Sequence, residues 1–236
     1  FSYNCTGSIT VDNHTIPCFG GEVHGSEDFT TAFAESCNTA FTQIGLDLGG
    51  SNLQKTAEDL LFNKKLPIPI DYTKSSTPGN PLLMQTSIGQ GNTLVSPMHM
   101  ALITSAIAND GKLMQPYYID RVETINGTKV KSTKPTVYKE LMTASEAATL
   151  TNLMAEVVNR GTGTQLSGES YSAAGKTGSA EYYGADGSIK THSWFIGFSN
   201  VEDPDIVVSV IAEESGSGSE VAVPIAQKIF DAYYNN

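Results

Sequence analysis

The chain has 236 residues, a formal net charge of −11 and a hydrophobic content of 39%, which is enough for one sizeable core. Its scattered Lys and Arg residues argue against a nucleic-acid partner, which needs clustered positive charge. The sequence contains no run of eighteen apolar residues, so it predicts no membrane span, and its first residues lack the pattern of a signal peptide. Because the chain begins at Phe1 rather than at a Met, we expect it to be a fragment of a longer protein.

Helical patterns dominate the first part of the chain. Residues 29–48 predict a helical segment around a polar interruption, with Gly49-Gly50 as its end. A second helix is expected over residues 52–63. Residues 66–81 contain four prolines and predict an extended loop.

Two further helices have recognisable end signals. Ser96 is placed as an N-cap before Pro97 at the first helical position, and Gly111 closes this helix. Thr143 and Glu146 are spaced as a capping box for the next helix.

The pattern changes from helix to strand near residue 170. Segments 171–183, 190–199 and 205–214 predict strands, and the last of them is apolar almost throughout, as in a strand covered on both faces. A closing helix is expected over about 220–234. Segregated helices and an antiparallel sheet define an α+β fold.

We therefore expect one domain over residues 1–236. Its helical part should span about 26–165, and its sheet with the closing helix about 170–234. The antiparallel sheet would be flanked by helices.

Lys176-Thr177-Gly178 lies on the first predicted strand. An ammonium beside a hydroxyl can hold a carboxylate, and a glycine in a strand allows a ligand to approach the backbone closely. A strand at a sheet edge can also pair with an extended peptide. By itself the tripeptide is common, and a surface lysine beside a turn is the alternative.

Ser36-Cys37-Asn38 lies at the polar break in segment 29–48. A hydroxyl and an amide two residues apart could face a cleft together. The alternative is that Ser36 and Asn38 act only as helix caps.

Together the two tripeptides match S-x-N and K-T-G, two motifs of the penicillin-recognising serine acyltransferases. The surrounding sequence resembles the transpeptidase domain of class B penicillin-binding proteins, of the kind that works in cell-shape or division machinery. The fold of that family would be incomplete in this chain. The resemblance extends over blocks in the order of the family, at residues 24–41, 87–116, 159–164, 173–181 and 192–200.

The resemblance implies three catalytic residues. Ser36 would pass a proton toward the leaving amine, and Asn38 would hydrogen-bond the side-chain amide of the acyl donor. Lys176 would sustain the positive potential of the site.

It also implies three substrate-binding residues on the same strand. Thr177 would bind the carboxylate of D-Ala-D-Ala or of a penicillin, and Gly178 would let the substrate lie against the strand. The backbone N–H of Ser179 would be one oxyanion donor.

The first motif of the family, S-x-x-K, is not found in this sequence. That motif supplies the acyl nucleophile and its activating lysine, which must lie within hydrogen-bond reach of each other. We therefore expect the chain alone to be inactive and a complementary N-terminal segment or chain to carry S-x-x-K.

The resemblance implies a peptidoglycan D,D-transpeptidase that cross-links stem peptides and is acylated by β-lactams, without a cofactor. It implies a location on the extracytoplasmic face of the bacterial membrane, with an N-terminal anchor helix outside this chain. The alternative is a β-lactam sensor or another non-catalytic penicillin-recognising module. A β-lactamase would need a deacylating base, for which Glu169 and Glu181 are weak candidates.

The three cysteines leave two interpretations open. Cys5 and Cys18 could form a disulfide or remain free thiols. Cys37 is interpreted as the buried middle residue of S-x-N rather than as a nucleophile. No CxxC or HExxH motif is present and the histidines are far apart in sequence, so no metal site is expected.

Overall fold

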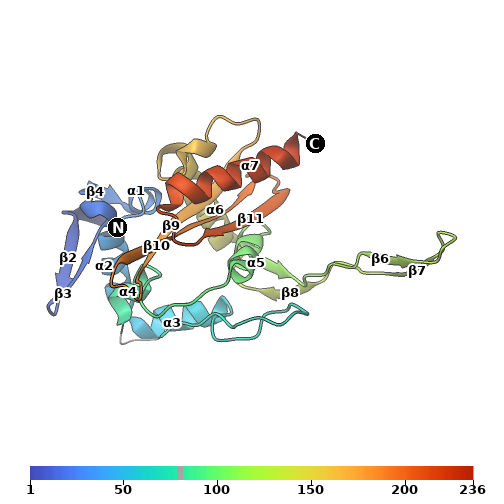
Figure 1. Cartoon of the computed structure of the whole chain (residues 1–236), viewed down its shortest axis with the longest axis horizontal. Coiled ribbons are helices and arrows are strands. Elements are labelled where there is room, and N and C mark those ends of the chain that lie inside the picture. The colour runs from blue at the N-terminus through green and yellow to red at the C-terminus, as the bar shows by residue number, and fades with distance from the viewer. Residues whose placement is uncertain (79–81, 236) are drawn as a thin grey trace.

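A central antiparallel sheet organises the computed structural model, which describes residues 1–78 and 82–235 (Figure 1). Its strands are β9 (Ala173–Tyr183), β10 (Ile189–Ser199) and β11 (Ile206–Ala212), in the order β11-β10-β9. The three predicted strands are confirmed, each within three residues of its expected ends. The fold is α+β, as predicted.

Helices cover both faces of this sheet. Helix α7 (Val223–Tyr234) packs on one face, and α5 (Pro97–Ile107) and α6 (Ala144–Arg160) pack on the other. Because side chains alternate along a strand, Phe195 points toward α7 while Phe198 packs with α5 and α6. This explains why the β11 sequence is apolar on both faces.

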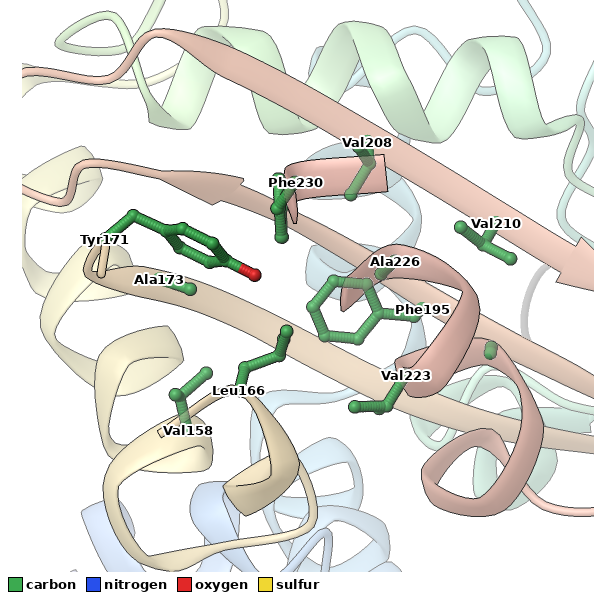
Figure 2. Close-up of a cluster of buried hydrophobic side chains, with 11 residues drawn as sticks. Val158, Leu166, Tyr171, Ala173, Phe195, Val208, Val210, Val223, Ala226 and Phe230 are labelled. Atoms are coloured by element: carbon green, nitrogen blue, oxygen red, sulfur yellow. The ribbon is translucent and has the colours of Figure 1, made fainter. Parts of the chain in front are cut away.

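The core beneath α7 is built around two phenylalanines (Figure 2). Phe195 on β10 and Phe230 on α7 are both fully buried. Burying a side chain of this size contributes about 1.5–3 kcal/mol. This cluster fixes the closing helix on the sheet and so holds β9, the strand that carries K-T-G, in place.

The helix ends follow local sequence signals. Ser96 caps α5 by accepting a hydrogen bond from the His99 N–H. Thr143 and Glu146 form the expected capping box at the start of α6.

The predicted segment 29–48 consists of α1 (Phe29–Ala34) and α2 (Asn38–Leu48), separated at the polar interruption. Helix α3 spans Gly50–Asp59, so the prediction began two residues late and ended four late.

The proline-containing loop has no helix or strand through residue 78, and its last residues, 79–81, lie outside the described residues. A short helix, α4 (Leu83–Ser87), follows. In the part of the chain that the structure describes, no helix is long and apolar enough to cross a membrane.

Four short strands near the N-terminus lie beside α1 and α2 (Figure 1). Strand β1 (Ser2–Cys5) pairs with β4 (Gly25–Asp28), and β2 (Ser8–Val11) pairs with β3 (His14–Pro17). A 3₁₀ turn over Phe19–Gly21 connects β3 to β4.

The region expected to be helical also contains four strands. Strand β5 (Lys112–Met114) pairs with β8 (Val137–Glu140). Between them, β6 (Arg121–Glu123) and β7 (Lys129–Ser132) form a hairpin that projects away from the body (Figure 1). A 3₁₀ turn over Thr164–Leu166 precedes β9, and a π-helical turn over Gly218–Ala222 precedes α7.

Candidate active site

Ser36 lies in a tight turn between α1 and α2. Its φ of 59° is in the left-handed region, which is unusual for a residue other than glycine. Backbone hydrogen bonds from Ser36 to Phe33 (3.2 Å) and from Cys37 to Ala32 (2.9 Å) hold the turn. Strained backbone of this kind persists only where surrounding contacts fix it, and it is common in functional sites.

Lys176 on β9 contacts this turn directly. Its Nζ donates to Ser36 Oγ at 2.7 Å and to the Thr177 carbonyl at 3.0 Å. The same ammonium lies 5.9 Å from the centre of the Phe33 ring. The structure therefore brings together two of the predicted motifs that are 140 residues apart in sequence.

The Lys176 ammonium has lost most of its contact with water. This burial disfavours the charged form and lowers the pKa of Lys176 from 10.5 to about 8. A cation with a lowered pKa beside a hydroxyl is typical of an active site that transfers protons near neutral pH.

Thr177 points to a different neighbour, Thr162, with the two hydroxyl oxygens 2.5 Å apart. The Thr162 N–H donates to the carbonyl of Ala34, at the end of α1. At Gly161, an added Cβ would lie 2.2 Å from that same carbonyl oxygen, so a side chain does not fit there. The loop after α6 thus connects K-T-G to the helix that precedes S-x-N.

No role was assigned to Thr162 from sequence, although it lies in the matched block 159–164. Its signal is the pattern Gly161-Thr162-Gly163 directly after a helix, where glycines allow a backbone to pack closely.

Gly178 and Ser179 pack against the start of the turn before α7. A Cβ at Gly218 would lie 2.6 Å from the Gly178 carbonyl oxygen, and Ser179 Oγ accepts a hydrogen bond from the Gly218 N–H at 3.2 Å. Among the described residues, β9 pairs with β10 only, so its other edge has no strand beside it. That edge is where an extended peptide could add as a further strand.

Asn38 contacts a different part of the chain from the other predicted site residues. Its Nδ2 donates to the carbonyl of Pro17 at 3.1 Å, at the end of β3. The structure thus joins Ser36, Lys176 and Thr177 in one region and ties Asn38 to the N-terminal strands.

Cys5 and Cys18 are free thiols with their sulfurs 3.6 Å apart, whereas a disulfide needs about 2.05 Å. Of the two alternatives that the sequence left open, the structure therefore has the free thiols and not the disulfide. Cys37 and His24 lie beside these two thiols, and the ligand atoms of the four residues are all within 4.8 Å of one another. Such a group could hold a metal ion. These four residues lie in separate segments of the sequence, so no short ligand spacing such as CxxC or HExxH marks them as a group.

Comparisons with known proteins agree with the predicted resemblance. Residues 2–231 match the penicillin binding protein transpeptidase domain family. A relative in Mycolicibacterium smegmatis, peptidoglycan D,D-transpeptidase PbpA, is 32% identical over an alignment of 229 residues that covers 90% of this chain and 46% of that protein. Peptidoglycan D,D-transpeptidase MrdA of Haemophilus influenzae is 27% identical, over 90% of this chain and 37% of that protein.

Solved structures show the same fold. The D,D-transpeptidase domain of a peptidoglycan glycosyltransferase from Eggerthella lenta has a TM-score of 0.89 and 29% identity, and the match covers 99% of this chain and 59% of that one. Penicillin-binding protein A of Mycobacterium tuberculosis, as a penicillin G acyl-enzyme complex, has a TM-score of 0.87 and 26% identity, with 99% and 56% coverage. This chain belongs to the penicillin binding protein transpeptidase domain family. It spans half or less of the length of these two relatives.

Proposed function

We propose that this chain is part of the transpeptidase domain of a peptidoglycan D,D-transpeptidase, which cross-links stem peptides by serine acyl transfer and is acylated by β-lactams. The observation that carries the proposal is the 2.7 Å hydrogen bond from Lys176 to Ser36, which joins the K-T-G and S-x-N motifs in a member of this family.

The nucleophile comes from a complementary segment that carries S-x-x-K, which this sequence lacks. Its serine attacks the carbonyl of the penultimate D-Ala, and the Ser179 N–H donates to the oxyanion. Lys176 stabilises the developing negative charge, and Ser36 passes a proton to the leaving D-Ala amine. Preorganised donors of this kind each contribute about 10²–10³ in rate.

Thr177 and Asn38 recognise the two ends of the acyl donor. The Thr177 hydroxyl binds the terminal carboxylate, and Thr162, 2.5 Å away, orients that hydroxyl. The Asn38 amide turns from Pro17 to the donor's side-chain amide. The open edge of β9 pairs with the donor backbone, and Gly178 leaves room for it to approach.

The proposed activity also implies the donor peptide, the location of the protein and its dependence on the complementary segment. The donor is a stem peptide that ends in D-Ala-D-Ala. The protein works on the extracytoplasmic face of the bacterial membrane, held by an N-terminal anchor helix beyond this chain. The 236 residues alone are inactive, and residues 1–236 act as one domain with the complementary segment.

A β-lactamase is less well supported. Glu169 accepts a hydrogen bond from Gln227 on α7, across the sheet from Lys176. Glu181 is exposed, five residues beyond Lys176 on β9. Neither carboxylate is placed beside the Ser36 turn as a deacylating base would be.

The first test is intact mass spectrometry with benzylpenicillin. The full-length protein should gain the mass of one drug molecule, whereas the isolated 236-residue chain should gain none. Lys176→Ala in the full-length protein should slow acylation by about 100-fold or more. Lys190→Ala, on the neighbouring strand β10, is the matched control and should acylate normally.

An adduct on the isolated chain would overturn the assignment of the nucleophile to another segment. Equal acylation of Lys176→Ala and Lys190→Ala would overturn the role of Lys176. A sensor is distinguished by a second assay: the full-length protein would be acylated by penicillin but would release no D-Ala from a stem peptide with an acceptor.

A further inference from the structure

We propose that the arm formed by residues 117–138 is a docking surface for an acidic, extended segment of a partner protein. The arm consists of the β6–β7 hairpin and the two stretches that connect it to β5 and β8, and it projects away from the body of the molecule (Figure 1). It contains none of the residues of the proposed active site.

The arm exposes large apolar side chains along its whole length. Tyr118 is 75% exposed, Val130 is 65% exposed, and Ile125 is fully exposed at the turn between the two strands. Five others are at least 43% exposed: Tyr117, Ile119, Val122, Val137 and Tyr138. A single apolar side chain on a surface is ordinary, but this concentration in one projecting segment marks a surface that another molecule covers.

Both strands of the hairpin have an open outer edge. Among the described residues, β6 and β7 pair only with each other, over three and four residues. A two-stranded hairpin is only marginally stable by itself, and its outer N–H and C=O groups can pair with an added strand. An extended segment at this edge would give the hairpin a third strand and cover the apolar side chains beside it.

The charge of the hairpin selects the partner. The whole chain has a net charge of −11, yet residues 121–134 contain one acidic residue, Glu123, and four basic ones: Arg121, Lys129, Lys131 and Lys134. Glu123 forms an ion pair with Arg121 at 2.9 Å. Among the described residues, the three lysines have no ion pair. An acidic segment would supply the missing negative charge, and complementary charge speeds and directs association.

A hollow at the base of the hairpin offers a place for one side chain of the segment. Its volume is about 130 Å³, and it lies between residues 119–122 and residues 131–133. Its lining includes the apolar Ile119 and Val122. On β7, Val130 lies between Lys129 and Lys131, so a matching strand carries acidic residues on either side of an apolar one.

Two other occupants fit these observations less well. A second copy of the chain that paired with the edge of β7 would bring lysines beside lysines, which is destabilising. A membrane of anionic lipids would be reached by the tip of the hairpin. Ile125 is at the tip, but the other exposed apolar side chains lie along the strands and at the base of the arm.

The test measures binding of a fluorescent synthetic peptide that alternates glutamate and valine to the full-length protein, by fluorescence anisotropy. Lys129→Glu combined with Lys131→Glu should weaken binding about tenfold or more, because repulsion replaces attraction at both positions. Lys55→Glu combined with Lys228→Glu changes two exposed lysines on α3 and α7 and is the matched control, with the same net charge. This control should bind as the wild type does, and a peptide with lysine in place of glutamate should not bind.

Hydrogen exchange determines where the peptide lies. The bound peptide should slow exchange of the backbone amides of residues 128–134 and leave those of β9 unchanged. Both double variants should melt at the wild-type temperature, because the changed side chains are exposed. Both should also be acylated by benzylpenicillin at the wild-type rate, so failure of the docking surface and failure of the proposed function give different results.

Four results would overturn the inference. Equal binding by the two double variants would show that the charge of the hairpin does not select the partner. Slower exchange in β9 instead of the hairpin would place the peptide at the edge next to K-T-G. Loss of binding to phosphatidylglycerol vesicles or to inorganic polyphosphate in the Lys129→Glu, Lys131→Glu variant, without any binding of the peptide, would assign the arm to a membrane or a polyanion. Failure of the peptide, the vesicles and polyphosphate to bind the wild type would show that the arm does not recognise acidic molecules.

Discussion

Raising the pH from 7 to 9 should deprotonate Lys176, whereas most lysines stay charged in this range. Burial lowers its pKa from 10.5 to about 8, so the ammonium that contacts Ser36 is lost between pH 7 and 9. With a pKa of about 8, the charged fraction falls about tenfold over these two pH units. The second-order rate constant for acylation of the full-length protein by benzylpenicillin should fall by the same factor.

Lys176→Arg is the control, because a guanidinium keeps its charge throughout this range. Whatever its rate at pH 7, the ratio of its acylation rates at pH 7 and pH 9 should stay near one. The assay is stopped-flow or quenched mass spectrometry at several pH values between 6 and 10. An equal fall in both proteins would assign the titration to another group and refute the reasoning.

The lowered pKa of Lys176 also determines whether the free energy of unfolding rises or falls with pH. The folded state releases the Lys176 proton near pH 8 and the unfolded chain near 10.5, so the unfolded state binds more protons between these values. Stability therefore rises with pH across this window, and the shift corresponds to about 3 kcal/mol. Lys176→Met, which cannot titrate, should lack this rise in denaturant unfolding.

Two further predictions concern the loop after α6. Thr162→Val removes the hydroxyl that orients Thr177, so it should raise the half-saturating concentration of benzylpenicillin about tenfold in saturation kinetics, and Thr162→Ser should restore it. An unchanged half-saturating concentration in Thr162→Val would show that Thr177 does not need the Thr162 hydroxyl. Gly161→Ala places a Cβ 2.2 Å from the Ala34 carbonyl oxygen and should cost about 1–3 kcal/mol, seen as a lower melting temperature. Gly163→Ala, whose Cβ meets its nearest atoms at 3.3 Å, should cost clearly less; equal losses would contradict the packing argument.

Local signals in the sequence determined the elements that depend on near neighbours. The N-cap at Ser96 and the capping box at Thr143 were predictable because each involves residues only three positions apart. The strand β11 was recognisable from its continuous apolar run. The two motifs also predicted that Ser36 and Lys176 belong to one site, through a resemblance to a family that the comparisons confirmed.

The tertiary structure decided what depends on distant residues. The short strands β1 to β4 carry little periodic signal, and their pairing is set by how the N-terminal segment folds against α1 and α2. The hydrogen bond from Lys176 to Ser36 and the pairing of Thr162 with Thr177 exist only once β9, α6 and α1 pack together.

The tertiary structure also decided how the cysteines are arranged. Sequence allowed Cys5 to pair with Cys18, but it could not place His24 and Cys37 beside them. The sequence by itself determined the longer helices, the central sheet and the family. Only the folded chain determined which side chains meet, because a contact between residues far apart in sequence depends on every element that packs between them.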